Sequence, residues 1–183
     1  MYPWIRLARE MFRARRLPPL GYGEVHSATI RCMPWDIDMQ MEMNNGRIIT
    51  LFDLVRVPMF QRMGVLDGLA DRKWFGMVLG SSIRYRRRIT LFQKLELRSR
   101  TLGVDDRFFY IEHGIFRDGE CCAHALVRTG MTTGKGIIPT QEVLDALNYE
   151  GTYPIPDWVR AWAEAEAQRP WPPMQDEMLQ AAE

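Results

Sequence analysis

Two acids and two amides lie close together in the segment Pro-Trp-Asp-Ile-Asp-Met-Gln-Met-Glu-Met-Asn-Asn-Gly-Arg, residues 34–47. Asp36 and Asp38 follow a stretch of alternating side chains, and Asn44 and Asn45 stand where an apolar helical pattern begins. A carboxylate can act as a general base, and N–H groups at the start of a helix can bind an oxygen that gains negative charge. This combination suits the attack of water on a polarised carbonyl group.

The neighbouring patterns predict the elements that position these groups. Residues 25–33 alternate between apolar and polar side chains, which predicts a strand. A helix is predicted from Asn45 to about Met63, and Pro58 predicts a kink or break in it near Val57. Its apolar stripe consists of Ile48, Leu51, Phe52, Val55, Met59 and Met63.

The rest of the chain predicts a meander of antiparallel strands followed by helices, an α+β fold. Strands are expected over 75–89, around Leu95 and Leu97, over 108–116 as a central strand, and over 120–133 after a hairpin turn at Asp118-Gly119. Thr140 is expected to cap a helix over 141–148, and a second helix is expected over 157–168. The proline-containing tail from Pro170 is expected to be poorly ordered.

Composition excludes several classes of protein. A chain of 183 residues fits one domain with appendages, and a net charge of +1 argues against a dedicated nucleic-acid-binding protein. Three cysteines, two of them adjacent, favour a reducing compartment, so we expect a cytoplasmic protein. No apolar run reaches the ~20 residues of a membrane span. His26, His113 and His124 show no metal-ligand spacing, so no metal site is expected.

The N-terminal segment predicts a short amphipathic helix. One face carries Trp4, Leu7, Ala8 and Met11, and five arginines lie nearby. Such a helix can lie on a membrane surface or pack on its own domain. Packing on its own domain is favoured, because so short a helix is not stable alone.

The motifs taken together resemble the hotdog-fold thioesterases, particularly the thioesterase-like branch related to 4-hydroxybenzoyl-CoA thioesterase. The resemblance rests on Asp-x-Asp followed by Met-Asn-Asn-Gly-Arg, the Asp53/Arg56 region, the arginine-rich strand around Tyr85, and Leu102-Gly103-x-Asp105-Asp106-Arg107-x-Phe109-Tyr110. It covers most of residues 20–135. It implies a hotdog fold, in which an antiparallel sheet wraps around one long central helix, with extra N- and C-terminal helices. The expected division is a helical segment 1–19, a hotdog domain 20–138, C-terminal helices 139–169 and a tail 170–183.

The resemblance also implies an activity and an assembly. The activity is hydrolysis of an acyl thioester, carried by coenzyme A or by acyl-carrier protein, to a carboxylic acid and a free thiol. No cofactor is expected beyond coenzyme A as part of the substrate. The assembly is a homodimer or a dimer of dimers with active sites at the subunit interface, and open sheet edges give a physical reason to dimerise.

The resemblance assigns roles to residues of the first motif. Asp38 is the first candidate for the base or nucleophile and Asp36 the second, and the backbone amides near Asn45 and Gly46 are candidates for the oxyanion site. The alternative is that the acids stabilise turns and that Asn44 or Asn45 only caps the helix.

This chain departs from the family pattern at two positions. Related thioesterases, including the plant acyl-carrier-protein branch, have Asp-x-Asn-x-His-x-Asn-Asn, whereas this chain has Gln40 and Glu42 at the Asn and His positions. Glu42 is a further candidate base if its pKa is raised. The change also supports an alternative function, a non-catalytic protein that binds acyl-CoA or an acyl chain.

Two further groups of residues are candidates. Asp53 is a secondary catalytic candidate, with an ion pair to Arg56 as the alternative. Arg84, Arg86 and Arg88 are predicted to share one strand face and to bind the phosphates of coenzyme A. The alternative for these arginines is a solvated face paired with Glu96.

Overall fold

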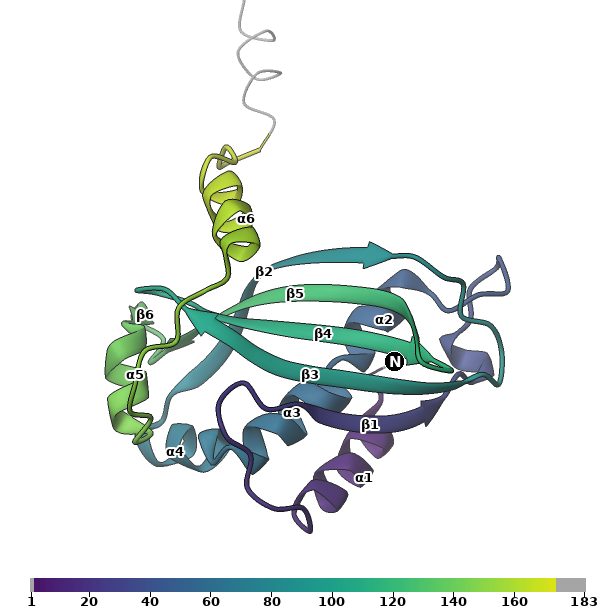
Figure 1. The fold of residues 1–183 in the computed structure, drawn as a ribbon, viewed down its shortest axis with the longest axis horizontal. Coiled ribbons are helices and arrows are strands. Elements are labelled where there is room, and N and C mark those ends of the chain that lie inside the picture. Colours follow the sequence, from purple (N-terminus) through teal and green to yellow (C-terminus); the bar gives the residue numbers. More distant parts are fainter. Residues whose placement is uncertain (1, 174–183) are drawn as a thin grey trace, which may run out of the picture.

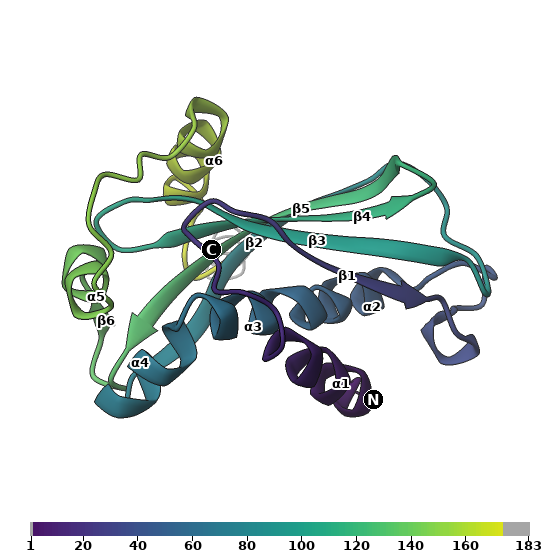
Figure 2. The same ribbon diagram turned by 60° about the horizontal axis from the view of Figure 1, so that its bottom comes forward.

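The protein, a computed structural model that describes residues 2–173, is built on one antiparallel sheet with helices along one face and the C-terminal helix against part of the other (Figure 2). The strands are β1 (His26–Arg31), β2 (Phe75–Tyr85), β3 (Lys94–Val104), β4 (Phe109–Arg117), β5 (Glu120–Thr132) and β6 (Ile137–Ile138). Their order is β1-β3-β4-β5-β2, with β6 added to β5 (Figure 1). The predicted α+β class with an antiparallel sheet is confirmed, but only β3, β4 and β5 form a meander, since β2 pairs with β5 and lies at one edge while β1 lies at the other.

Side-chain alternation explains the strands that the sequence predicted. Along β3, Leu95, Leu97 and Ser99 are buried while the residues between them are more exposed. β4 is buried on both faces because it lies at the centre of the sheet, with helices on either side. Asp118 and Gly119 both have positive φ, 50° and 85°, which is typical of the two-residue turn predicted between β4 and β5.

The strand predicted over 75–89 ends earlier, at Tyr85. The N–H groups of Arg86 and Arg87 both donate to the carbonyl oxygen of Cys122, so the chain leaves the regular hydrogen-bond ladder at this point. Arg86 and Arg88 therefore do not continue the strand face on which Arg84 lies. The prediction of one arginine-bearing strand face was wrong beyond Tyr85.

The single long helix predicted from Asn45 is divided in the structure. Helices α2 (Asn45–Leu51) and α3 (Asp53–Arg62) meet at Phe52, and α4 (Val65–Arg72) follows after Gly64. Phe52 keeps helical angles, but its N–H bonds to the carbonyls of both Ile48 and Ile49, a local tightening. Of the kink or break predicted near Val57, the break was wrong, since α3 runs through Pro58. The predicted stripe faces the sheet and is buried, except for the half-buried Met63.

The N-terminal helix α1 (Trp4–Ala14) packs against α3 on the same side of the sheet (Figure 2). Leu7 contacts the main core, and Glu10 and Ala14 are buried. The prediction that this helix packs on its own domain is confirmed. Its exposed side chains include Trp4 and Ala8, which were predicted on the packed face.

The C-terminal helices are α5 (Thr140–Ala146) and α6 (Asp157–Ala167). Thr140 begins α5 but does not cap it, because its hydroxyl donates to the carbonyl of Asp105 instead. α6 lies on the sheet face opposite α1–α4 and packs through Val159 on Leu126 and Tyr110 (Figure 2). The predicted tail lies largely outside the described residues. No helix within residues 2–173 combines the length and apolar content needed to cross a membrane.

A glycine in β3 lets the C-terminal segment approach the sheet. A Cβ on Gly103 would lie 2.6 Å from the carbonyl oxygen of Pro154, which is backbone and cannot rotate away. We expect Gly103→Ala to lower the free energy of unfolding by about 1–3 kcal/mol in urea titrations. Gly76→Ala is the matched control, because its Cβ would meet only the flexible end of the Met131 side chain, with the sulfur at 3.5 Å. Equal effects of the two substitutions would contradict this role for Gly103.

Candidate active site

A cleft of about 440 Å³ opens beside the first turn of α2. It is lined by Tyr2, Trp35, Ile37, Asp38, Asn44, Arg47 and Thr50. Of the residues that the sequence singled out, Asp38 and Asn44 therefore meet in one cleft. The other five come from the N-terminus, from the segment after β1 and from α2 itself.

Asp38 lies in a small closed loop between β1 and α2. Ile37 and Met43 pair across the base of this loop, and the Asp38 N–H donates to the carbonyl of Glu42 at 2.9 Å. One carboxylate oxygen, Oδ1, accepts a hydrogen bond from the N–H of Gln40 at 2.9 Å. The other, Oδ2, makes no hydrogen bond to any residue within 2–173. Asp38 is thus held by one oxygen while the second remains able to accept a proton.

The first turn of α2 carries N–H groups next to the cleft, although Asn45 and Gly46 are not among the residues that line it. Asn44 is the N-cap, and its side-chain oxygen accepts the N–H of Arg47 at 3.1 Å. The N–H groups of Asn45 and Gly46 have no acceptor in the described part of the chain. A Cβ on Gly46 would lie 3.2 Å from the Asn44 side-chain oxygen, so a larger residue would crowd the cap. The helix start therefore offers donors to an oxygen, as first turns generally do.

Asp36 lies beneath the cleft rather than in it. Its carboxylate is buried and accepts from Arg6 Nη1 at 2.9 Å and from the Met33 N–H at 3.0 Å, while Arg47 Nε lies 3.2 Å from its other oxygen. Its carbonyl oxygen accepts the Asn44 N–H at 2.9 Å. These contacts tie α1, the loop and the start of α2 together, which is a positioning role.

Glu42 and Arg88 form an ion pair at the outer side of the Asp38 loop. Arg88 Nε donates to the Glu42 carboxylate at 2.7 Å, and its Nη2 donates to the carbonyl of Gln40 at 3.0 Å. The acid at the histidine position of the family pattern is thus paired, and Arg88 holds the loop closed. Neither residue lines the cleft.

Asp53 lies further along the helices and is also paired. Its carboxylate accepts the Tyr2 hydroxyl at 2.8 Å and forms an ion pair with Arg56. Burial and the bond to Asp53 raise the pKa of Tyr2 to about 12. Tyr2 therefore stays protonated at neutral pH and connects Asp53 to the edge of the cleft.

Arg84 and Arg86 lie away from this cleft. Arg84 lines a separate cleft of about 370 Å³ on the other face of the sheet, beside Trp158 of α6, and Arg86 is exposed after the end of β2. The predicted set of three phosphate-binding arginines is therefore spread over two regions of the molecule. Glu96, the predicted partner of such a face, bonds to Arg98 instead.

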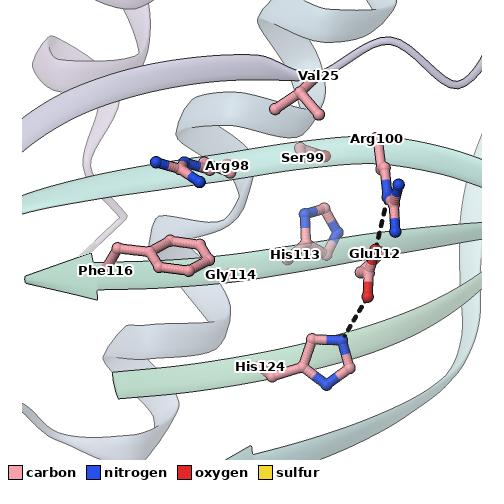
Figure 3. Close-up of a pocket in the computed structure, with 9 residues that line it drawn as sticks. All are labelled: Val25, Arg98, Ser99, Arg100, Glu112, His113, Gly114, Phe116 and His124. Carbon is pink, nitrogen blue, oxygen red and sulfur yellow. Dashed lines mark hydrogen bonds and ion pairs between the residues drawn. The ribbon is translucent and has the colours of Figure 1, made fainter. Parts of the chain in front are cut away.

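A third cleft, of about 340 Å³, lies on the outer face of the sheet (Figure 3). Arg100, Glu112 and His124 form a line across β3, β4 and β5, with N–O distances of 2.6 Å and 2.8 Å. The hydrogen bond from His124 and the neighbouring Arg100 hold the pKa of Glu112 below its usual value. None of the predicted catalytic residues lies here. Among the described residues, no group of three or more His, Cys, Asp or Glu side chains is placed to hold a metal ion.

Two histidines lie on the inner face of the sheet, against the helices. His26, Ser99 and His113 form one row across β1, β3 and β4, and all three are buried. His113 stacks on Phe52 with ring centres 4.8 Å apart. Burial lowers the pKa of His26 to about 4 and lowers that of His113 well below 6.5. Both side chains are therefore neutral in the folded protein at neutral pH.

These histidines predict a loss of stability as the pH falls. In the unfolded chain a histidine binds a proton near pH 6.5, whereas the folded protein does not bind it until a lower pH. The unfolded state thus binds more protons between pH 6.5 and about 4, and the free energy of unfolding should fall by about 1 kcal/mol per pH unit for each histidine. Urea titrations between pH 7 and pH 5 measure this slope. His113→Gln should reduce this slope, and an equal slope in wild type and His113→Gln would contradict the assignment.

Local sequence patterns missed several residues that line the cleft beside α2. Arg47 and Thr50 lie one turn apart on α2, so helical spacing from Asn44 was a usable signal for them. No local signal pointed to Tyr2, because its contact with Asp53 joins positions 51 residues apart. Trp35 lies between β1 and Asp38 in the sequence, so a position near the cleft could have been expected. A tryptophan side chain by itself, however, suggested no role there.

The antiparallel sheet and the helices across one of its faces define a hotdog fold. The chain belongs to the thioesterase-like superfamily, whose family model matches residues 32–163. This confirms the resemblance found in the motifs.

Similar sequences come from animals. The chain is 34% identical over 110 residues to protein THEM6 of Xenopus laevis, covering 60% of this chain and 53% of the relative. It is 31% identical over 133 residues to protein THEM6 of Danio rerio, covering 72% of this chain and 64% of the relative. The match thus spans about half to two thirds of the length of these relatives.

Solved structures show the same fold. The probable thioesterase YbaW of Escherichia coli superposes with a TM-score of 0.63 at 17% identity, covering 68% of this chain and 97% of YbaW. The DHNA-CoA thioesterase of Staphylococcus aureus superposes with a TM-score of 0.58 at 16% identity, covering 78% of this chain and 91% of that enzyme. At these identities the likeness supports the hotdog fold alone.

Proposed function

We propose that this domain hydrolyses an acyl thioester to a carboxylic acid and a free thiol, with Asp38 as the reacting carboxylate. One observation carries the proposal. Asp38, which has one carboxylate oxygen without a hydrogen bond within the described chain, lines the cleft at the start of α2, and the N–H groups of Asn45 and Gly46 in the adjoining first turn have no acceptor there. A base and a pair of donors are the two elements that acyl transfer needs.

The proposed reaction uses these groups in order. The carbonyl oxygen of the thioester accepts the N–H groups of Asn45 and Gly46, which stabilise its negative charge as the tetrahedral intermediate forms. Asp38 takes a proton from the attacking water, or attacks the carbonyl carbon itself. In the first case the carbon–sulfur bond breaks and Asp38 returns the proton to the leaving thiolate. In the second case the thiolate leaves as a mixed anhydride forms on Asp38 and takes a proton from water, and a second water molecule then hydrolyses the anhydride to the carboxylic acid and free Asp38. Asn44 holds the helix start in place through its cap.

The substrate is proposed to be an acyl-CoA or an acyl-carrier-protein thioester, in a homodimer or a dimer of dimers. The exposed edge strand β2 supports self-association. Among the described residues β2 pairs only with β5, and Phe75, Met77 and Val78 on it are exposed. Pairing of β2 with its copy would cover both an open edge and these apolar side chains. A cytoplasmic location, in line with the free thiols of the three cysteines, is part of the same proposal.

Thiol release from short, medium, long and aromatic acyl-CoAs tests this function. The expected result is turnover of at least one member, with one equivalent of acid formed for each thiol. The same panel as non-hydrolysable thioether analogues, titrated by calorimetry, identifies binding without chemistry. Tight analogue binding with no thiol release from any thioester would contradict hydrolysis and indicate the non-catalytic acyl-binding protein.

A further inference from the structure

The outward face of α1 exposes large apolar side chains. Trp4, Ile5 and Phe12 are 70%, 88% and 55% exposed, and Leu17, just beyond the helix, is 46% exposed. Ile5 and Phe12 are seven residues apart, so they lie two turns apart on the same side of the helix. Isolated apolar residues on a surface are ordinary, but a group on one face marks a contact surface.

The opposite face of α1 is already fixed to the domain. Ala14 and Glu10 are buried, Arg6 bonds to Asp36 at 2.9 Å, and Tyr2, just before the helix, bonds to Asp53. A short helix in water normally has to be folded by the surface that it binds, which weakens binding. Helix α1 is already folded before it meets a partner. Binding through its outward side chains therefore does not require free energy to fold the helix.

The charges around this apolar face are basic. Arg9, Arg13, Arg15 and Arg16 are exposed on α1 and its end. The single acid within the helix, Glu10, is buried and is paired with Arg9 and Arg13 at 2.9 Å and 3.6 Å. The surface therefore keeps a net positive charge, and the Arg16 guanidinium lies over the ring of Phe12, 4.3 Å from its centre.

We infer that the outward face of α1 docks this protein on an anionic lipid surface. Apolar side chains would enter the boundary between headgroups and acyl chains, and the arginines would meet lipid phosphates. A groove of about 500 Å³ between α1 and β1 is lined by Arg13 and Arg16 and can admit a headgroup. A second copy of this chain fits less well, since two such faces would bring like charges together. The inference does not depend on thioester hydrolysis.

Co-sedimentation of the full chain with lipid vesicles tests the inference. Vesicles of equal parts phosphatidylcholine and phosphatidylglycerol should bind the protein at least tenfold more strongly than vesicles of phosphatidylcholine alone, and added salt should weaken the binding. The double variant Ile5→Ser/Phe12→Ser should bind the anionic vesicles about tenfold or more weakly. Arg16→Gln should bind more weakly by a few-fold.

Helix α6 supplies matched controls on the opposite face of the sheet. Trp158→Ser removes another exposed aromatic residue and Arg160→Gln another exposed arginine, and neither should change vesicle binding. Thermal unfolding of each variant shows that the fold is kept, which is expected because the changed side chains are exposed. Equal binding of the double variant and wild type would overturn the inference, as would no binding of wild type to anionic vesicles. A further contrary outcome is a wild type that forms an oligomer without binding vesicles. If the double variant Ile5→Ser/Phe12→Ser is then a monomer, this face serves self-association.

Discussion

Asp38→Asn should lower kcat for thioester hydrolysis by about 10²–10⁴-fold without loss of fold. Asparagine has nearly the same shape, and its side-chain oxygen can still accept the N–H of Gln40 that holds the loop. It cannot take a proton from water or attack a carbonyl carbon. Steady-state thiol release gives kcat and KM, and thermal unfolding gives stability. KM should change little, because the lost interaction acts in the transition state.

Glu42→Gln is the control for this prediction. Glu42 carries the same charge a few residues away, but its carboxylate is paired with Arg88 outside the cleft. Its removal should loosen the Asp38 loop and lower kcat by less than tenfold, a size typical of indirect effects on positioning. A larger loss of kcat in Glu42→Gln than in Asp38→Asn would move the reacting carboxylate to position 42.

Asp36→Asn should lower the free energy of unfolding by about 3 kcal/mol or more. The Asp36 carboxylate is buried and lies against the guanidinium groups of Arg6 and Arg47, which are themselves largely buried. Removing the negative charge leaves two positive charges together in a poorly solvated place. Urea titration measures the change, and activity should fall as well, because the same contacts position α2.

An ion pair with a half-buried acid and an exposed arginine provides the comparison for Asp36. Glu166 pairs with Arg169 at 3.0 Å near the end of α6, and the arginine is mostly exposed. Glu166→Gln should therefore change stability by less than about 1 kcal/mol. If Asp36→Asn were no more damaging than Glu166→Gln, Asp36 would not hold α1, the loop and α2 together.

Local patterns predicted most of the sheet. These patterns depend on residues that are neighbours in the sequence. The structure contains the predicted alternation around Leu97, the strand buried on both faces at the centre of the sheet, and the turn at Asp118-Gly119. The end of β2 could not be found this way. It depends on the carbonyl of Cys122, more than thirty residues further along, which captures two N–H groups.

The helical region shows the same limit. The sequence predicted a start at Asn45 and a buried stripe, and both are present. Pro58 pointed to a break near Val57, but the irregularity lies at Phe52, whose N–H is shared between two carbonyls. Phe52 also stacks on His113 of β4, a contact that only the folded sheet creates.

Prediction of the site was partial for a similar reason. The acid–amide motif pointed to a segment whose Asp38 and Asn44 line one cleft, while Asn45 and Gly46 do not line it. It could not separate Asp36 from Asp38, because the difference lies in Arg6, which reaches Asp36 from another helix. That Asp38 is the reacting group stays a prediction until its chemistry is measured.

The most direct test of this account is kcat for thiol release from the best acyl-CoA substrate by four single variants. The set is Asp36→Asn, Asp38→Asn, Glu42→Gln and Asp53→Asn. We expect Asp38→Asn alone to lose the chemical step while keeping wild-type stability, and Asp36→Asn to lose activity together with stability. Near-normal turnover by a folded Asp38→Asn, with loss of turnover in a folded Glu42→Gln or Asp53→Asn, would contradict it.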